Sequence, residues 1–148
     1  MVTINFIAKN FNELSLEELY EILRARSEIF IVEQNMHCQD MDGIDFGARH
    51  FFIEENGKVL AYLRAFYADD DKNTVKIGRV LSIMHGIGLG ADIMRKAMAD
   101  IKKNMKCQKI CLNSQKSAIE FYEKLGFKTV SDEFLEESVI HVKMEFEI

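Results

Sequence analysis

Residues 75–104 read VKIGRVLSIMHGIGLGADIMRKAMADIKKN and contain the most informative pattern in the chain. Val75 to Ser82 is a short, mainly apolar run, which predicts a buried strand. From about Gly88 to Asn104, apolar residues recur at helical spacing and predict a helix with one apolar face. The chain has only 8 glycines, and three of them, Gly86, Gly88 and Gly90, fall within one five-residue stretch where the strand is followed by the helix.

This glycine segment is expected to bind an anion. Glycine lets the backbone approach a ligand closely and turn its amides outward. A helix that begins just after it presents unpaired amides and the positive end of its dipole, which attract a phosphate. A tight turn is the alternative, but one glycine would suffice for a turn. The alternation of Gly86, Gly88 and Gly90 therefore favours an anion site.

Two common phosphate-binding motifs are excluded by the flanking residues. Gly86, Gly88 and Ala91 match the spacing of the dinucleotide fingerprint, which also needs an acidic residue about 20 positions later, after the next strand. Lys109 to Ser114 contains no carboxylate. A nucleoside triphosphate loop needs Gly-Lys-Ser/Thr, whereas Ala91 follows the last glycine.

The residues before this stretch predict a strand, a helix and a hairpin. Ser15 and Glu18 form a capping box, so a helix should begin at Leu16. Asn56-Gly57 is the dipeptide preferred in a tight hairpin turn. The expected segments, in chain order, are a strand over 2–8, the helix from 16, its continuation or a second short helix over 29–32, a polar loop over 35–47, strands over 50–54 and 59–68, and a charged turn over 69–73.

The residues after it predict a strand over 109–113, a helix over 117–125 that Gly126 ends, and closing strands over 127–134 and 139–146. Hairpins place strands antiparallel, whereas the strand–helix–strand unit over 75–113 places two strands parallel. No repeat, low-complexity tract or linker is seen. The order predicts an α+β fold, with a mixed, mostly antiparallel sheet flanked by helices, in a single domain over 1–148.

Composition narrows the function classes. The 148 residues are 48% hydrophobic, which is enough for a core without metals or disulfides. With 19 basic and 24 acidic residues, the net charge of -5 argues against nucleic-acid binding. No apolar run spans a bilayer and no leader-like start is seen, so no membrane association and a cytoplasmic location are expected. Cys38, Cys107 and Cys111 lack paired spacing, which predicts reduced thiols and no metal site.

Several segments together resemble the GCN5-related N-acetyltransferases (the GNAT family). The strand and glycine turn resemble that family's acetyl-CoA signature, Arg/Gln-x-x-Gly-x-Gly/Ala at a helix start. His85 stands where the family has Arg or Gln, and the turn is about two residues shorter than usual. Residues 118–127, AIEFYEKLGF, resemble its second signature, Ala-x-x-x-Tyr-x-x-x-Gly-Phe. Residues 30–35, 40–43 and 77–80, with His141, resemble the ElaA-like branch, so the resemblance covers nearly the whole chain.

The resemblance implies a sheet with two splayed parallel central strands. It implies direct transfer of an acetyl group from acetyl-CoA to a primary amine of a small molecule or peptide, without a metal. The pantetheine arm would lie between 77–82 and 109–113, and a backbone amide near Leu81 would stabilise the oxyanion. The resemblance leaves open whether the protein forms a homodimer. The implied acetyl-CoA-binding residues are Val80, Leu81, Ser82, His85, Gly86, Ile87, Gly88, Leu89, Gly90, Ala91 and Asn113.

The resemblance also implies catalytic roles. Tyr122 would protonate the departing thiolate as general acid, the alternative being a half-buried aromatic side chain on a helix. Glu33 and His141 are candidate bases, the alternatives being a solvated carboxylate at a helix end and a hydrogen-bonded histidine on a sheet face. Arg79, inside an apolar strand, is expected to need a partner, with Asp42 or Glu33 in reach.

Two other functions compete with catalysis. A non-catalytic acyl-CoA-binding or sensory module of the same fold would keep the glycine turn and would not need Tyr122. A protein-interaction domain that binds no CoA would need neither the glycine turn nor Tyr122. The presence of the glycine cluster argues against this function. Nothing in the sequence names the acceptor amine.

Overall fold

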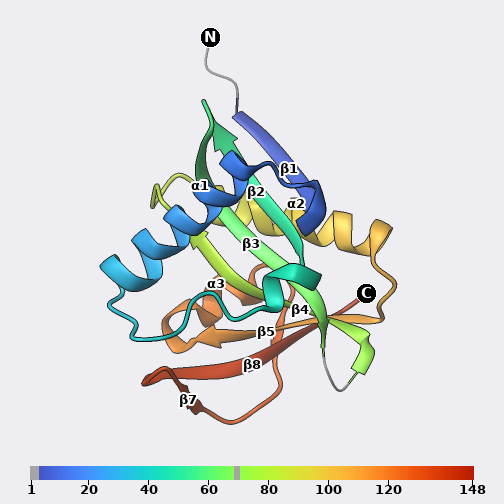
Figure 1. Cartoon of the computed structure of the whole chain (residues 1–148). Coiled ribbons are helices and arrows are strands. Elements are labelled where there is room, and N and C mark those ends of the chain that lie inside the picture. The colour runs from blue at the N-terminus through green and yellow to red at the C-terminus, as the bar shows by residue number, and fades with distance from the viewer. Residues whose placement is uncertain (1–3, 69–70) are drawn as a thin grey trace.

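The structure is a computed structural model that describes residues 4–68 and 71–148 (Figure 1). Its strands are β1 (Ile4–Asn10), β2 (Arg49–Glu55), β3 (Lys58–Ala68), β4 (Asp71–Ser82), β5 (Lys109–Gln115), β6 (Lys128–Thr129), β7 (Phe134–Glu136) and β8 (Val139–Glu147). Its α-helices are α1 (Leu16–Arg26), α2 (Leu89–Asn104) and α3 (Ile119–Glu123). Short 3-10 or π turns occur at η1 (Phe11–Glu13), η2 (Ser27–Glu33), η3 (Ile44–Gly47) and η4 (Lys116–Ala118).

The strands form one mixed sheet in the order β1-β2-β3-β4-β5-β8-β6, and β7 pairs with β8. β4 and β5 run parallel, whereas the other recorded pairs are antiparallel. α1 lies in front of the sheet and α2 behind it (Figure 1). The predicted α+β fold, with a mostly antiparallel sheet flanked by helices, is confirmed.

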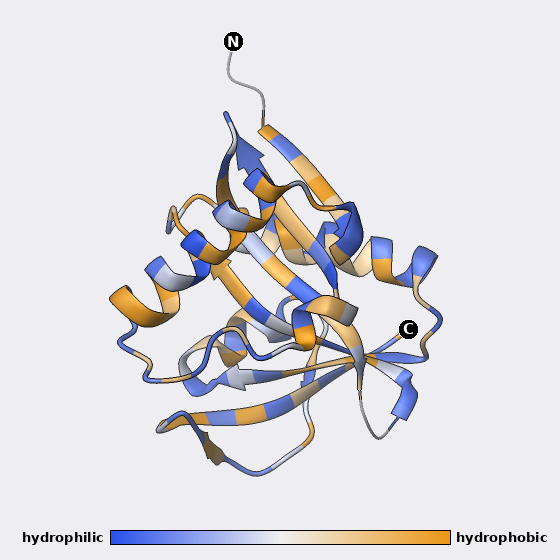
Figure 2. Ribbon diagram, in the orientation of Figure 1, coloured by the Kyte–Doolittle hydropathy of each residue, from blue (hydrophilic) through white to orange (hydrophobic). Residues whose placement is uncertain are grey.

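Each face of the sheet has its own apolar core. Behind the sheet, the apolar face of α2 packs on the central strands; its buried residues are Ile93, Met94, Ala97, Met98 and Ile101. In front, Ile22 and Ala25 of α1 pack against Phe52, Tyr62 and Leu81. The closing strand β8 alternates hydrophobic and hydrophilic residues along its length (Figure 2). Strand alternation and helical spacing therefore locate both cores correctly.

The predicted local signals are present in the structure. The Ser15 hydroxyl accepts the Glu18 amide at 3.0 Å, and the Glu18 carboxylate accepts the Ser15 amide at 2.8 Å. Asn56 and Gly57 have φ angles of 52° and 78°, as a tight hairpin turn requires. Residues 29–32 continue the first helix as the π turn η2.

Several predicted boundaries are wrong. The strand predicted over 127–134 is only the two-residue β6, because the Ser131 hydroxyl accepts the Lys143 amide at 2.8 Å and replaces a ladder bond. The helix predicted over 117–125 is the 3-10 turn η4 followed by the short α3. The predicted loop ends in η3, and β4 already begins at Asp71, within the predicted turn. Part of that turn, residues 69–70, and the start of the first predicted strand lie outside the described residues.

The two parallel strands separate soon after they pair. Recorded pairs join residues 74–76 of β4 to 109–111 of β5, and none follows in the described chain. β4 also contains a bulge, since Tyr62 and Arg64 of β3 face Leu81 and Gly78. At this bulge Arg79 adopts a φ of 55°, which is uncommon for a residue with a side chain. The predicted splaying of the central strands is therefore seen.

Buried charges hold the loop before β2 against the sheet. We call them the Arg–Asp cluster, whose members are Arg26, Arg64, Arg79, Asp40, Asp42 and Asp45. Arg26 is fully buried and bonds Asp45 at 2.7 Å and Asp40 at 3.1 Å. Arg64 bonds Asp42 at 2.7 Å and Asp45 at 2.9 Å. The cluster thus links α1, the loop and β3.

We expect Arg26→Met to lower the free energy of unfolding by about 3 kcal/mol, because it leaves buried carboxylates short of a partner. Urea denaturation followed by circular dichroism measures this change. Lys116→Met is the control, since its ion pair with Glu133 is exposed and should contribute less than about 1 kcal/mol. A loss of less than about 1 kcal/mol for Arg26→Met would contradict a structural role for the cluster.

The cluster also predicts acid sensitivity. Burial raises the pKa of Asp42, but bonds from Arg64 and from the Ile44 amide outweigh burial and bring it to about 2. A carboxyl group with a lowered pKa stabilises the fold fully above about pH 5, and this stabilisation is lost as the pH falls through the folded-state value. Urea midpoints should fall between pH 5 and pH 2, and less steeply in Asp42→Asn. Equal slopes would count against this assignment.

Candidate functional site

The glycine turn joins β4 to α2. Gly86 and Gly88 have φ angles of 82° and 80°, and a Cβ atom on either would meet no atom within 4 Å. Gly90 serves packing instead, because its Cβ position lies 3.5 Å from the Phe121 ring. α2 begins at Leu89, so the first amides of the helix are unused by the helix and border this open turn. The geometry fits a bound phosphate group.

The residues that flank the turn are exposed or half-buried. The Ser82 hydroxyl donates to the Met84 carbonyl at 3.0 Å. The His85 imidazole is exposed and lies 3.1 Å from the Glu33 carboxylate. Glu33, one of the two candidate bases, is therefore held at the glycine turn by His85.

A cavity of about 600 Å³ opens beside the separated strands, and we call it the β4–β5 cavity. Four of the predicted site residues line it: Val80, Asn113, Tyr122 and His141. The glycine turn and Glu33 are not among its lining residues within the described chain. The predicted site residues thus form two neighbouring groups, one at the turn and one in the cavity.

Tyr122 lies at the wall formed by α3. Its side chain is buried and packs edge-on against Phe121 and Phe127. No hydrogen bond is recorded for its hydroxyl among the described residues. Burial raises the pKa of Tyr122 to about 12, so the phenol keeps its proton at neutral pH. A protonated, unbonded phenol at a cavity wall can donate to a bound group.

His141 on β8 is buried, and its Nδ1 lies 2.8 Å from the Val139 carbonyl. Because a carbonyl only accepts, Nδ1 carries a proton, so Nε2 is the ring nitrogen that can have a free lone pair. Nε2 lies 3.5 Å from the Glu136 carboxylate, which also accepts a bond from Asn113 at 3.0 Å. The cavity therefore contains a histidine nitrogen able to accept a proton beside a carboxylate.

Arg79 has different partners from those expected. Its Nε donates to Asp40 at 2.9 Å, and a second nitrogen lies 3.4 Å from Asp42. The prediction of Asp42 as a partner is confirmed, at a longer distance than that to Asp40. The prediction of Glu33 is wrong, because the Glu33 carboxylate is bonded to His85. The Asp40 bond ties the strained residue of the β4 bulge to the loop before β2.

The sequence did not reveal several residues of the site. Lys76, Gln34 and Glu136 line the β4–β5 cavity, although they stand far apart in the sequence. Beside the Arg–Asp cluster, His50 donates from Nε2 to the Asp45 carbonyl at 2.9 Å and accepts the Tyr62 hydroxyl at 2.6 Å. Burial lowers the pKa of His50, which keeps this ring neutral. Only the alternation along the strands could have indicated that Lys76 faces away from α2.

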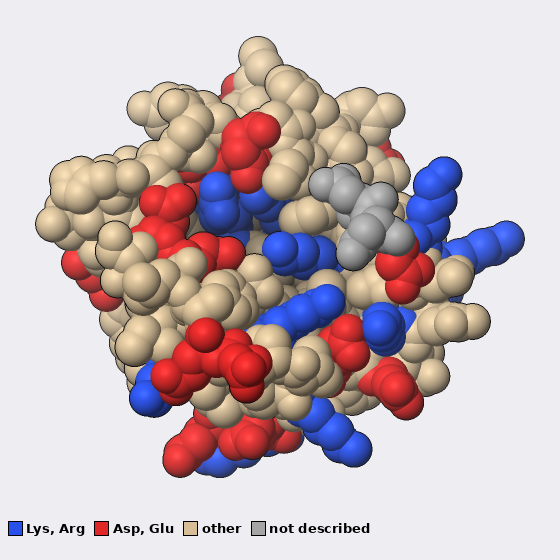
Figure 3. Space-filling view, turned by 90° about the horizontal axis from the view of Figure 1, so that it is seen from below, with Lys and Arg blue, Asp and Glu red and all other residues tan. Residues whose placement is uncertain are grey.

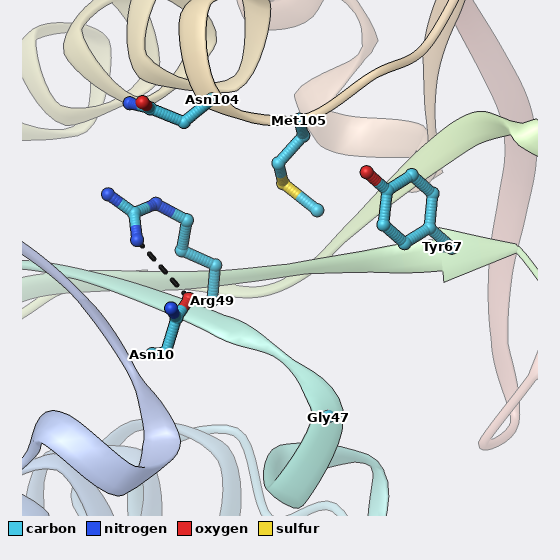
Figure 4. A pocket seen from close by; sticks show the side chains of 6 residues that line it. All are labelled: Asn10, Gly47, Arg49, Tyr67, Asn104 and Met105. Carbon is cyan, nitrogen blue, oxygen red and sulfur yellow. Dashed lines mark hydrogen bonds between the residues drawn. The ribbon is translucent and has the colours of Figure 1, made fainter.

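A second cleft, of about 400 Å³, lies at the C-terminal end of α2. Figure 4 shows the Arg49 guanidinium between Asn104 and Asn10, with a bond to Asn10. Arg49 also binds Asp100 through two bonds, of 2.7 and 3.1 Å. The sixteen residues of α2 separate this cleft from the glycine turn by about 24 Å, and no predicted site residue lines it.

Residues 4–68 and 71–148 contain neither a candidate metal cluster nor a candidate membrane-spanning helix. No group of three or more His, Cys, Asp or Glu residues is placed to hold a metal ion there. No helix in this part of the chain is long and apolar enough to cross a membrane.

Comparison with known proteins gives a consistent result. The sequence profile of the acetyltransferase (GNAT) domain matches residues 12–148. A UPF0039 protein of Schizosaccharomyces pombe is 35% identical, with all of both chains covered. Protein ElaA of Escherichia coli is 33% identical over 93% of this chain and 92% of its own.

Solved structures agree with the sequence relatives. The crystal structure of Escherichia coli ElaA superposes with a TM-score of 0.91 and 32% identity, covering 98% of this chain and all of that one. An acyl-CoA N-acyltransferase from Pseudomonas aeruginosa gives a TM-score of 0.90 and 31% identity, covering 97% of this chain and 99% of that one. The chain therefore belongs to the GNAT family of acyl-CoA-dependent acyltransferases, in the branch that contains ElaA.

Proposed function

We propose that the protein is an N-acetyltransferase that moves an acetyl group from acetyl-CoA directly to a primary amine. The observation that carries the proposal is the juxtaposition of an open glycine turn with a cavity lined by Tyr122 and His141. The turn supplies an anion site and the cavity supplies an acid and a base. The name of the Pseudomonas aeruginosa relative, an acyl-CoA N-acyltransferase, supports the same chemistry.

The glycine turn would bind the pyrophosphate of acetyl-CoA through the amides of residues 86–91. Those amides need no long side chain to bind phosphate, so His85 can occupy the position where the family has Arg or Gln. The pantetheine arm would then run between β4 and β5, where the recorded pairing ends after residues 76 and 111. This route brings the thioester to Val80 and Leu81.

The β4 bulge would supply the oxyanion donor. A bulge leaves one residue of the longer strand unpaired, and this frees a backbone amide between Arg79 and Leu81. That amide would face the thioester oxygen as the amine attacks, and a fixed donor of this kind contributes most where water is excluded. The Asp40–Arg79 ion pair would hold the bulge in place.

His141 is the better candidate for the base. Its Nε2 lone pair borders the cavity, and the Glu136 carboxylate would stabilise the ring once it is protonated. Glu33 is less suitable, because it is exposed and bonded to His85. In the proposed step the acceptor ammonium first loses one proton to solvent, and the neutral amine nitrogen then bonds to the acetyl carbon. The carbon–sulfur bond breaks, His141 takes the second proton from nitrogen and Tyr122 gives one to sulfur.

Gly88→Ala tests the binding site. An alanine at φ 80° is strained, so the turn should shift and the affinity for acetyl-CoA should fall about tenfold or more. Isothermal calorimetry measures the dissociation constant. Gly57→Ala is a matched control, because Gly57 has a φ of 78° and open surroundings in the hairpin between β2 and β3. Equal affinities in both variants, or no binding by the native protein at millimolar acetyl-CoA, would refute the site.

Release of the CoA thiol over a panel of primary amines tests catalysis. Tyr122→Phe should slow release about 10²-fold or more, because the leaving thiolate loses its proton donor. Stability should change by less than about 0.5 kcal/mol, since the hydroxyl has no recorded partner. Tyr20→Phe, on the exposed side of α1, is the control. Release unaffected by Tyr122→Phe would remove the proposed acid, and acetyl-CoA binding without release to any amine would favour a non-catalytic acyl-CoA-binding module.

A further inference from the structure

The charged side chains around the β4–β5 cavity are not all compensated. In the Arg–Asp cluster, three arginines face three aspartates, and every member takes part in at least one ion pair. Lys76 also lines the cavity, and no carboxylate of the described residues forms an ion pair with it. The cluster is therefore neutral as a unit, and Lys76 adds to the lining a positive charge that has no ion-pair partner among residues 4–68 and 71–148.

The position of Lys76 is set by the sheet. It lies on β4 opposite Phe66 of β3 and Cys111 of β5. Its neighbours Val75 and Ile77 are buried in the core beneath α2, so Lys76 projects from the other face. The residue is half-buried, and an unpaired ammonium in such a place is less well solvated than at the surface.

Two acidic residues next to the proposed base also line the cavity. They are Glu136 and Glu137, and Glu136 lies beside Asn113 and His141. Figure 3 looks at this side of the molecule from below and shows lysine and arginine side chains across its middle, with acidic side chains around them. The cavity thus has a positive side at Lys76 and a negative side next to the proposed base.

We infer that the acceptor amine also carries an anionic group, which Lys76 binds while the ammonium group enters beside Glu136. This inference rests on the proposed N-acetyl transfer. Asn113 lies two residues beyond Cys111, the strand partner of Lys76, so about 7 Å of strand separates the two sides. A cavity of about 600 Å³ accommodates a small molecule of this kind. A diamine would place a second positive charge against Lys76.

Three amines of equal chain length test the inference: 6-aminohexanoate, hexylamine and 1,6-diaminohexane. The native protein should acetylate 6-aminohexanoate with the highest kcat/KM. Lys76→Met should lower that value about tenfold and leave the value for hexylamine within about twofold. Lys76→Glu should shift the preference towards the diamine. Lys143→Met is the matched control, because Lys143 lies on β8, which β5 separates from β4, is near Glu145 and is not among the described residues that line the cavity.

The outcomes separate this inference from the proposed function. Equal kcat/KM values for 6-aminohexanoate and hexylamine, unchanged in Lys76→Met, would overturn the inference and leave N-acetyl transfer intact. If acetyl-CoA binds but no amine is acetylated, the proposed function fails. The inference about Lys76 is then tested by measuring how tightly 6-aminohexanoate binds. NMR titration with 6-aminohexanoate should then give weaker affinity for Lys76→Met than for the native protein and for Lys143→Met, and equal affinities would overturn it.

Discussion

The guanidinium of Arg26 is fully buried, and the surroundings of the cavity are arranged to neutralise it. A buried charge without a partner destabilises a fold by several kcal/mol, so the loop before β2 must bring its carboxylates to this point. Asp45 and Asp40 meet Arg26 there. Once the loop is in place, Asp40 and Asp42 also reach the arginines of β3 and β4. One buried charge therefore determines how a helix, a loop and two strands fit together.

This constraint extends to the part of β4 where the proposed chemistry takes place. The bulge in β4 is strained at Arg79, and the ion pair with Asp40 stabilises the strained conformation. Because β4 bends away, β5 loses its partner beyond residue 111 and a cavity opens between the strands. A substrate arm between two strands would replace the missing strand-to-strand contacts. In the proposed function, a local defect in the sheet would thus serve as the binding site.

The two walls of the cavity differ in their charges. On the side of the Arg–Asp cluster, positive and negative groups cancel, and Lys76 contributes the remaining charge. On the other side, Glu136 and His141 form a pair that suits an incoming ammonium group. Tyr122 of α3 also lines the cavity, and it stays protonated at neutral pH because burial raises its pKa to about 12. An acceptor with both an amine and an acid group would match this distribution.

The sequence by itself determined the fold class, the capped helix at Ser15, the hairpin at Asn56-Gly57 and the glycine turn before α2. These features depend on residues a few positions apart, so local backbone preferences and side-chain periodicity are enough to predict them. The motifs also indicated Tyr122 and His141 as site residues, and their catalytic roles stay predictions. Only the tertiary structure decided that Arg79 pairs with Asp40, that Glu33 is bonded to His85, and that Lys76 and Glu136 line the same cavity. Such contacts join residues tens of positions apart, and they form only when the sheet and its bulge bring distant segments together.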